Sequence, residues 1–243
     1  MPPRNAVEGE PADQFEGSLV GGPGQTRSML GSALLDVVLP IECGGCGAPS
    51  TRWCSACADA LQVHTDEPHV VVPRVDPGVP VFALGRYAGP RRQAIVAMKE
   101  RGRRDLTAPL ARALALGVQR LIDWGVVASP LILVPAPTRR SAARRRGGDP
   151  VTRMAVAACW ARPDIHVVAA LRTAALVRDS VGLSGSDRER NIAGRVRVTR
   201  PVPAGEVLVV DDILTTGATA REAVRALAAA GVPVAAVLAA AHA

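Results

Sequence analysis

Aromatic residues make up only 2% of this 243-residue chain, so its core must be built from Val, Leu, Ile and Ala. Lysine is scarcer still, because Lys99 is the single lysine among 29 basic residues. No uninterrupted apolar run approaches the roughly 18 residues that a membrane-spanning helix needs. No basic, apolar, small-residue signal sequence opens the chain either. We therefore expect a cytoplasmic protein without a membrane span.

The length and charge of the chain limit the fold size and the kind of ligand that we expect. A chain of this size can bury one full α/β core and a small additional module. The formal net charge of +7 favours an anionic ligand, either nucleotide-like or nucleic acid. The five cysteines, in the reducing compartment that we expect, favour metal binding or a buried thiol over disulfides.

Composition divides the chain into four parts. Residues 1–28 are rich in Gly, Pro and acids and lack periodicity, which predicts a disordered extension, and Met29 or a start near it is our candidate for the functional beginning. A short amphipathic helix and a cysteine module fill residues 29–64, and residues 65–80 form a linker. Strand and helix patterns then alternate over residues 81–243, which predicts an α/β fold with a mostly parallel sheet.

The cysteine module carries two C-x-x-C pairs separated by seven residues, the spacing of a zinc ribbon. Its four thiolates would close a tetrahedral structural zinc site. The candidate zinc ligands are Cys43, Cys46, Cys54 and Cys57. A pair of redox motifs or loose surface cysteines is the alternative interpretation. Cys159 lies in an apolar helical pattern instead and is expected to be a buried, unreactive thiol.

One stretch near the end of the chain organises the rest. The four apolar residues 207–210 predict a strand that is buried on both faces of a parallel sheet. Asp211 and Asp212 follow this strand, and strong helix formers occupy residues 220–230. A polar loop connects the two elements, and it contains Thr215, Thr216, Gly217, Ala218 and Thr219. Strand, loop and helix in this order place a ligand site at the carboxyl end of a sheet strand.

The residue types of this loop suit a phosphate. N–H groups at a helix start attract an anion, the threonines can donate hydroxyl hydrogen bonds, and Gly217 lets the backbone approach the ligand. Two adjacent carboxylates suit a neighbouring diol, or a magnesium ion and its waters. A diol beside a phosphate is a ribose phosphate. Capping by Thr215 or Thr216 is the alternative, but a cap requires only one such residue.

This loop resembles the phosphoribosyl-pyrophosphate (PRPP) loop of type I phosphoribosyltransferases, in which four hydrophobic residues and two acids precede a Thr-Thr-Gly-x-Thr-like cradle. The resemblance implies that Asp211 and Asp212 hold the ribose hydroxyls and that residues 215–219 hold the 5-phosphate, with Mg²⁺ bound together with PRPP. It also implies the fold of that class, a mostly parallel sheet with flanking helices and a hood.

A second anion-binding candidate follows the expected strand at residues 131–134. Five arginines and two glycines in residues 139–148 suit a polyphosphate or a nucleic-acid backbone. The resemblance places a pyrophosphate-binding segment here, with Arg139, Arg144 and Arg146 as its candidate residues. Where that family has Arg-Gly-Phe-Asn-Gln, this chain ends the basic run differently, with Gly147, Gly148, Asp149 and Pro150.

A basic segment after residue 81 resembles one branch of the phosphoribosyltransferases, the ComF competence-protein family, which joins a four-cysteine zinc ribbon to this core. The matching residues are Tyr87, Gly89, Arg92, Ile95, Lys99 and Gly102. Because Lys99 is the single lysine and falls on the family's lysine position, we expect a specific role for it. The long, irregular segment 172–197 corresponds to the hood, although Ser180 stands where a glutamine is usual and Val196 where a phenylalanine is.

The sequence therefore predicts a ComF-like protein that binds PRPP and Mg²⁺. The resemblance implies a part in natural transformation, with single-stranded DNA and the DNA-uptake machinery as partners. If the protein is a transferase, its catalytic candidates are Lys99, Arg139, Asp211 and Asp212. Two alternatives remain open: a phosphoribosyltransferase of nucleotide metabolism or salvage, and a non-catalytic single-stranded DNA-binding protein or PRPP sensor.

Overall fold

The computed structural model describes residues 41–137, 148–174 and 193–243. The extension predicted for residues 1–28 and the helix expected before the first cysteine lie outside the described residues. The division of the chain into the four predicted parts stays a prediction.

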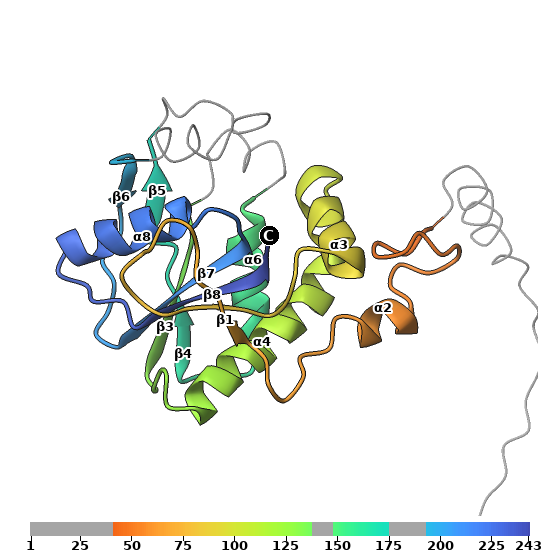
Figure 1. Cartoon of the computed structure of the whole chain (residues 1–243), viewed down its shortest axis with the longest axis horizontal. Helices are drawn as coiled ribbons and strands as arrows, with labels where there is room; N and C mark the ends of the chain where they lie inside the picture. Colours follow the sequence, from red (N-terminus) through yellow and green to blue (C-terminus); the bar gives the residue numbers. More distant parts are fainter. Residues whose placement is uncertain (1–40, 138–147, 175–192) are drawn as a thin grey trace, which may run out of the picture. The chain divides into compact units, whose positions relative to one another are not determined.

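A six-stranded, mostly parallel sheet forms the centre of the described chain (Figure 1). Its strands are β1 (His69–Val70), β2 (Val81–Ala83), β3 (Leu131–Pro135), β4 (Ile165–Val167), β7 (Glu206–Leu214) and β8 (Ala236–His242). Their order across the sheet is β1-β2-β8-β7-β3-β4, and only the β1–β2 pair is antiparallel. The predicted α/β fold with a mostly parallel sheet is confirmed.

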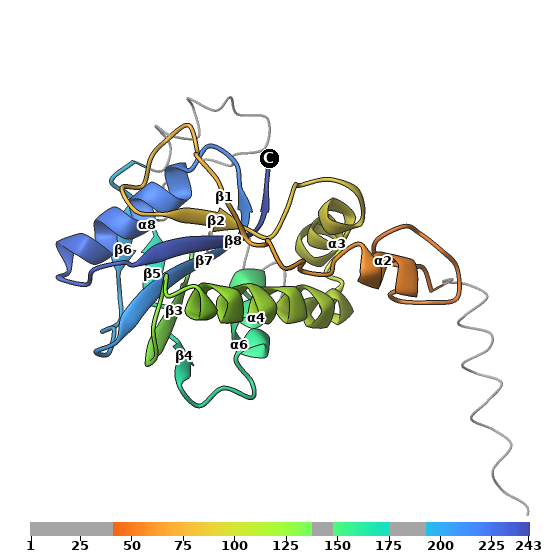
Figure 2. The ribbon, with the colours of Figure 1, turned by 60° about the horizontal axis from the view of Figure 1, so that its bottom comes forward.

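Helices cover both faces of this sheet (Figure 2). One face packs against α3 (Gly89–Glu100), α4 (Thr107–Asp123) and α6 (Pro150–Ala158). The other packs against α8 (Ala218–Ala229) and a small antiparallel sheet made of β5 (Leu171–Thr173) and β6 (Val196–Val198). The remaining described elements are α2 (Ser55–Asp59) and the 3₁₀ helix η1 (Arg104–Leu106).

Strand β7 is enclosed on both edges, because it pairs with β3 on one edge and β8 on the other. Val207 and Val209 belong to the cluster beneath α8, whereas Leu208 and Val210 belong to the cluster beneath α4. All four are at most 2% exposed, which confirms the prediction of a strand buried on both faces. A strand in that position reads as a continuous apolar run rather than an alternation.

Several element boundaries differ from the pattern-based expectation. The apolar spacing of residues 105–124 predicts a single helix, but η1 precedes α4 and Asp105 lies in η1, where its carboxylate pairs with Arg103. The apolar run of residues 167–171 likewise predicts a single strand. The chain instead leaves the main sheet after β4 and enters the small sheet at β5, so the apolar run is divided between two sheets.

Parts of the expected linker and of the expected hood lie within the described residues. Within residues 65–80, β1 joins the main sheet, and Val71 and Val79 pack against the cluster beneath α8. The segment predicted to be a hood begins and ends in the β5–β6 pair, where Thr173 lies opposite Val196. Residues 175–192 lie outside the described residues.

Two leucines of α4 allow a matched test of the core. Leu114 is fully buried, whereas Leu116 is 48% exposed on the same helix. We expect Leu114→Ala to lower the free energy of unfolding by about 2–5 kcal/mol, because it leaves a cavity. Leu116→Ala should cost less than about 1 kcal/mol. Urea denaturation followed by circular dichroism measures both, and equal effects would contradict the assigned burial.

Candidate functional site

The two acids that end β7 differ sharply in their surroundings. Asp212 is 3% exposed, and its partner is Lys99 on α3. The Lys99 Nζ lies 2.9 Å from Oδ1 and 2.8 Å from Oδ2 of this carboxylate. The single lysine of the chain is thus an ion-pair partner of one predicted ribose-binding acid.

One oxygen of this buried carboxylate is left with a hydrogen-bonding capacity to fill. The Lys99 Nζ lies within 2.9 Å of both carboxylate oxygens, and its hydrogen bond goes to Oδ1 of Asp212, so Oδ2 has this ionic contact but no well-directed hydrogen bond from the described residues. A buried carboxylate oxygen can accept a further donor from water or a ligand. A ligand hydroxyl is one such donor.

Asp211 is half-buried, and its Oδ1 accepts a hydrogen bond of 2.8 Å from the backbone N–H of Asp212. Burial and the neighbouring Asp212 carboxylate raise the pKa of Asp211 well above its usual value, and Lys99 offsets only part of this shift. Perturbed carboxyl groups of this kind are common at ligand and catalytic sites.

The loop after β7 leads directly into α8. Thr215 is exposed, Thr216 and Thr219 are partly exposed, and Ala218 is the first residue of α8. The Thr216 hydroxyl oxygen accepts a hydrogen bond of 3.3 Å from the Ala218 N–H. The N-cap residue of α8 is Gly217 and no side chain caps the helix, so neither Thr215 nor Thr216 is the N-cap that we gave as the alternative to phosphate binding.

Gly217 has a structural requirement of its own. Its φ of +88° lies in the left-handed region, and a Cβ placed on it would lie 2.4 Å from the carbonyl oxygen of Val75. The Val75 N–H donates a hydrogen bond of 2.8 Å to the Thr216 carbonyl. The segment around Val75 therefore packs directly on this loop, a contact that the sequence pattern did not reveal.

The start of α3 explains how Lys99 is positioned. Arg91 is 6% exposed and donates a hydrogen bond of 3.1 Å from Nη1 to the carbonyl of Ala240 on β8. Burial lowers the pKa of this guanidinium. Ile95, one turn further along, is fully buried in the core beneath α4. These two anchors fix α3 against the sheet, and Lys99 follows one turn after Ile95.

The predicted pyrophosphate loop leaves the sheet beside the acid pair. Pro135, the last residue of β3, lies opposite Val210, and the N–H of Ala136 donates a hydrogen bond of 2.7 Å to the Val210 carbonyl. The chain resumes before α6, where the Asp149 carboxylate caps the helix by accepting from the Val151 N–H. The candidate residues Arg139, Arg144 and Arg146 lie outside the described residues.

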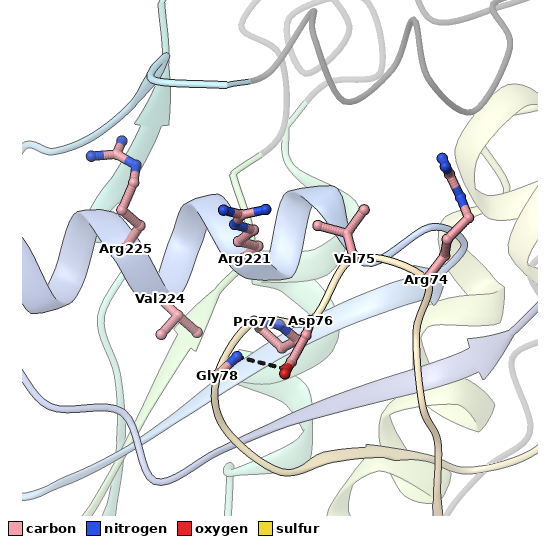
Figure 3. A pocket seen from close by; sticks show the side chains of 8 residues that line it. All are labelled: Arg74, Val75, Asp76, Pro77, Gly78, Arg221, Val224 and Arg225. Atoms are coloured by element: carbon pink, nitrogen blue, oxygen red, sulfur yellow. Dashed lines mark hydrogen bonds between the residues drawn. The ribbon is translucent and has the colours of Figure 1, made fainter.

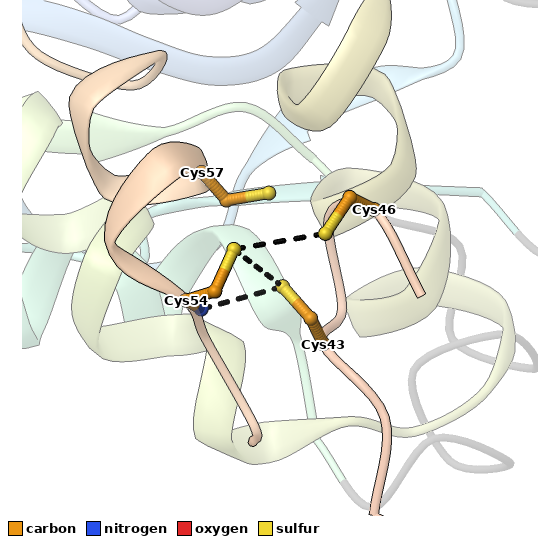
Figure 4. A group of neighbouring side chains, drawn as sticks. All are labelled: Cys43, Cys46, Cys54 and Cys57. Carbon is orange, nitrogen blue, oxygen red and sulfur yellow. Dashed lines mark hydrogen bonds between the residues drawn. The ribbon is translucent and has the colours of Figure 1, made fainter. Parts of the chain in front are cut away.

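The four predicted zinc ligands converge in space (Figure 4). Their sulfur atoms all lie within 4.8 Å of one another, and the Sγ of Cys54 is 3.6 Å from those of Cys43 and Cys46. A Zn–S distance of about 2.3 Å in a tetrahedron requires sulfurs roughly 3.8 Å apart. The cluster therefore fits a zinc ion.

Two thiols of this four-cysteine cluster differ in their surroundings. Burial and hydrogen bonds with the neighbouring cysteines raise the pKa of the Cys57 thiol well above its usual value. Burial raises the pKa of the Cys43 thiol, but backbone hydrogen bonds around the turn outweigh it and bring the pKa to about 6. Gly45 is needed for close packing, because a Cβ there would lie 2.5 Å from the Cys57 sulfur. Cys159 is partly buried, and burial raises its pKa to about 11, as expected for an unreactive thiol.

Arg103 connects the four-cysteine cluster to the main fold. Its Nη1 donates to the Glu42 carbonyl at 3.0 Å and its Nη2 to the Arg52 carbonyl at 3.1 Å. Glu42 and Arg52 lie just before the first and the second C-x-x-C pair. The same guanidinium pairs with Asp105 at 2.6 Å, which lowers the pKa of that carboxyl. The local sequence around Arg103 is a basic run that carries no signal of this bridging role.

The chain resembles one curated protein. It is 26% identical over 187 residues to the DNA utilization protein YhgH of Escherichia coli (strain K12), and the match covers 74% of each chain. No protein-family model matches the chain. Among the described residues, no helix is both long enough and apolar enough to cross a membrane.

Removing one cysteine of the cluster should release the metal. We expect Cys57→Ser to lose most of its bound zinc and to unfold locally around α2, because three thiolates leave a structural site incomplete. Cys159→Ser is the matched control, since this thiol lies outside the cluster and should leave the zinc content unchanged. Atomic absorption of the purified variants measures both, and a zinc-replete Cys57→Ser would contradict the assignment.

The Lys99–Asp212 pair should show the energetics of a buried ion pair. We expect Lys99→Met to lower the free energy of unfolding by roughly 1–3 kcal/mol, less than for a fully buried pair because Lys99 is a quarter exposed. The double variant Lys99→Met with Asp212→Leu should recover stability, since no charge remains unpaired. Chemical denaturation tests both, and a double variant less stable than Lys99→Met alone would contradict this account.

Proposed function

We propose that this chain is a ComF-like protein that binds PRPP together with Mg²⁺ at the carboxyl end of β7 and takes part in handling DNA. The observation that carries the proposal is the acid pair, whose buried member Asp212 is held by Lys99 and directly precedes a loop of threonines at a helix start. A ribose diol and a phosphate on the same ligand would satisfy both parts.

The acids would bind the ribose. Asp212 offers Oδ2 to one hydroxyl, because this oxygen has the ionic contact with Lys99 but no well-directed hydrogen bond from the described residues. Asp211 offers its carboxylate to the other, while its Oδ1 also accepts from the Asp212 N–H. Lys99 acts as a positioning residue, because its ion pair fixes the orientation of the Asp212 side chain and balances its charge.

The loop would bind the 5-phosphate. The 12-residue helix α8 begins at Ala218, so its free N–H groups and its dipole favour an anion at this end. The hydroxyls of Thr215 and Thr219 are available as donors, because neither makes a hydrogen bond within the described part of the chain. Thr216 keeps its own hydroxyl proton for the phosphate, since only its oxygen is used in the hydrogen bond from the Ala218 N–H.

Magnesium fits this site only together with the ligand. Mg²⁺ is usually held by one or two carboxylates and by substrate phosphates. Lys99 already occupies one side of Asp212, so the oxygens left for the ion are those of Asp211, of water and of the pyrophosphate. When bound, the ion would neutralise charge on the pyrophosphate leaving group.

A transfer reaction would need residues in addition to those that bind the ribose and the 5-phosphate. A nucleophile would displace pyrophosphate at ribose C1, and the arginines from Arg139 to Arg146 would stabilise the leaving group. We assign no acceptor and no base to this site. We therefore propose ligand binding as the primary activity.

The DNA-related part of the proposal is supported by the similarity to a protein named for DNA utilization and by the net charge of +7. A salvage enzyme would need a surface that recognises a nucleobase, and residues 172–197 contain no aromatic side chain for stacking. That composition favours the DNA-related proposal over a salvage transferase.

The variant Asp211→Asn distinguishes an effect on PRPP binding from an effect on the stability of the fold. The raised pKa means that the folded protein holds the Asp211 proton more tightly than the unfolded chain does. Stability from this group is therefore present at low pH and is lost as the pH rises through the folded pKa. The asparagine amide does not ionise, so the variant does not lose stability as the pH rises. We therefore expect Asp211→Asn to melt no lower than the wild type at neutral pH. We also expect it to lose PRPP affinity at least tenfold.

Isothermal titration with PRPP, with and without Mg²⁺, measures the affinity, and differential scanning calorimetry measures the melting temperature. Asp66→Asn, at an exposed aspartate, is the matched control and should leave binding unchanged. Binding by the wild type that Asp211→Asn does not weaken would exclude Asp211 from the site. Failure of the folded, zinc-loaded wild type to bind PRPP would overturn the proposal.

A further inference from the structure

The four-cysteine cluster and the acid pair are joined by the short segment at the end of α3. Lys99 lies in the last turn of this helix, where it pairs with Asp212. Arg103 follows four positions later, and its guanidinium donates to the carbonyls of Glu42 and Arg52 at the cluster. The side chain that holds the buried carboxylate and the side chain that holds the cluster are therefore close together in the chain.

The backbone between Lys99 and Arg103 is held in a defined turn. Gly102 has a φ of +66°, in the left-handed region that favours glycine. The N–H of Arg103 points back to the helix and donates a hydrogen bond of 3.1 Å to the carbonyl of Ala97, in the last turn of α3. Because this bond closes the end of the helix, the positions of Arg103 and of the last turn of α3 depend on each other.

The cluster supplies both hydrogen-bond acceptors and packing to this turn. The Arg52 carbonyl accepts from Arg103 and also, at 3.0 Å, from the N–H of Gly44 between the first two cysteines. Gly44 packs on Leu106 of η1, since a Cβ on this glycine would lie 2.5 Å from the Leu106 Cδ1. A small structural zinc site folds with its metal and unfolds without it. Loss of zinc would therefore remove acceptors from Arg103 and packing from Leu106.

The ion pair of Arg103 with Asp105 does not replace these contacts. Arg103 donates to Asp105 from Nε at 2.9 Å and from Nη2 at 2.6 Å. Because the two residues are only two positions apart, their pair fixes the shape of the turn and not its position against the cluster. The hydrogen bonds to the Glu42 and Arg52 carbonyls span 61 and 51 residues, so they fix that position.

The loop proposed to bind the 5-phosphate has a different support. Residues 74–78 lie beside α8, and together they line an open cavity of about 610 Å³ (Figure 3). The N–H of Val75 in this segment donates to the Thr216 carbonyl of the loop. This support belongs to the α8 face of the sheet, whereas α3 covers the other face. A change at Arg103 would therefore act on the acid pair and not on the phosphate loop.

We propose that Arg103 is a positioning residue through which the zinc-loaded cluster orients Lys99 toward Asp212 and so raises the affinity of the acid pair for its ligand. That this ligand is PRPP rests on the proposed function. The cluster has two states, folded with zinc and unfolded without it, and only the folded state holds the acceptors of Arg103 in fixed positions. Such a difference between two states couples two binding sites, and the coupling is reciprocal.

The single lysine of the chain makes this link measurable without a ligand. Selective ¹³C labelling of lysine gives one Cε signal in the nuclear magnetic resonance spectrum of the full-length, zinc-saturated chain, and its chemical shift reports the surroundings of Lys99. We expect Arg103→Ala to move this signal toward its position in the urea-unfolded chain, because Lys99 is held less firmly at Asp212. An unchanged signal would overturn the proposal.

Arg162→Ala is the matched control for this variant. Arg162 pairs with Asp164 two positions later, at 2.8 Å and 2.7 Å, in the same arrangement as Arg103 and Asp105. It also donates to a distant side chain, that of Gln119 on α4. It lies between α6 and β4, so its loss should leave the Lys99 signal unchanged. Equal shifts in the two variants would show a general loss of stability and would overturn the proposal.

Calorimetric titration with PRPP and Mg²⁺ measures the effect on the ligand site. We expect zinc-saturated Arg103→Ala to bind PRPP about fivefold more weakly or worse, and Arg162→Ala to bind it as the wild type does. In equilibrium competition with the zinc chelator TPEN, PRPP with Mg²⁺ should raise the zinc affinity of the wild type but not that of Arg103→Ala. Wild-type PRPP affinity in Arg103→Ala, or an equal effect of PRPP on the zinc affinity of both proteins, would overturn the proposal.

The lysine signal also separates this inference from the proposed function. If the wild type binds no PRPP but Arg103→Ala shifts the Lys99 signal, the link from the cluster to Lys99 stands and the PRPP proposal is overturned. If the wild type binds PRPP and Arg103→Ala changes neither the signal nor the affinity, the PRPP proposal stands and the role of Arg103 is overturned.

Discussion

The buried carboxylate of Asp212 sets the strongest constraint on this structure. A strand enclosed on both edges and both faces cannot end in an unbalanced charge without a large desolvation cost. Lys99 meets that cost from α3, and α3 is in turn anchored to β8 by the buried guanidinium of Arg91. The ion pair therefore depends on a chain of contacts that joins the first half of the domain to the last two strands.

Arginines join the other parts of the described chain in a similar way, through backbone carbonyl groups. Arg103 bridges both halves of the four-cysteine cluster to η1, and Arg225 ties α8 to β6. A guanidinium can donate several hydrogen bonds in fixed directions, which a lysine cannot do. This difference gives a physical reason for the use of arginine at structural bridges, and of the single lysine where one compact charge faces one buried carboxylate.

Local sequence patterns predicted much of this fold. Contacts between residues far apart in the sequence could not be predicted in this way. The apolar run of β7 and the spacing of the four cysteines are local, and both predictions agree with the structure. Lys99 and Asp212 are 113 residues apart, so no spacing rule could pair them, although the rarity of lysine singled out Lys99. The packing of Val75 on Gly217 depends on how a segment expected to be a linker folds back onto the loop before α8. The pattern of that segment carries no such signal.

The contrast between the two adjacent acids is the strongest physical argument for a ligand at this edge of the sheet. Asp212 has a cationic partner, whereas the pKa of Asp211 is raised by burial and by its neighbour, with only partial relief from Lys99. At neutral pH an ionised Asp211 lowers the stability of the fold. If Asp211 served only to hold the loop, this loss of stability would be unnecessary. An asparagine at this position could accept the same hydrogen bond from the Asp212 N–H without a charge. Only the carboxylate form accepts two hydroxyl donors while carrying a negative charge, so a ligand bound at Asp211, as we propose, would account for this cost.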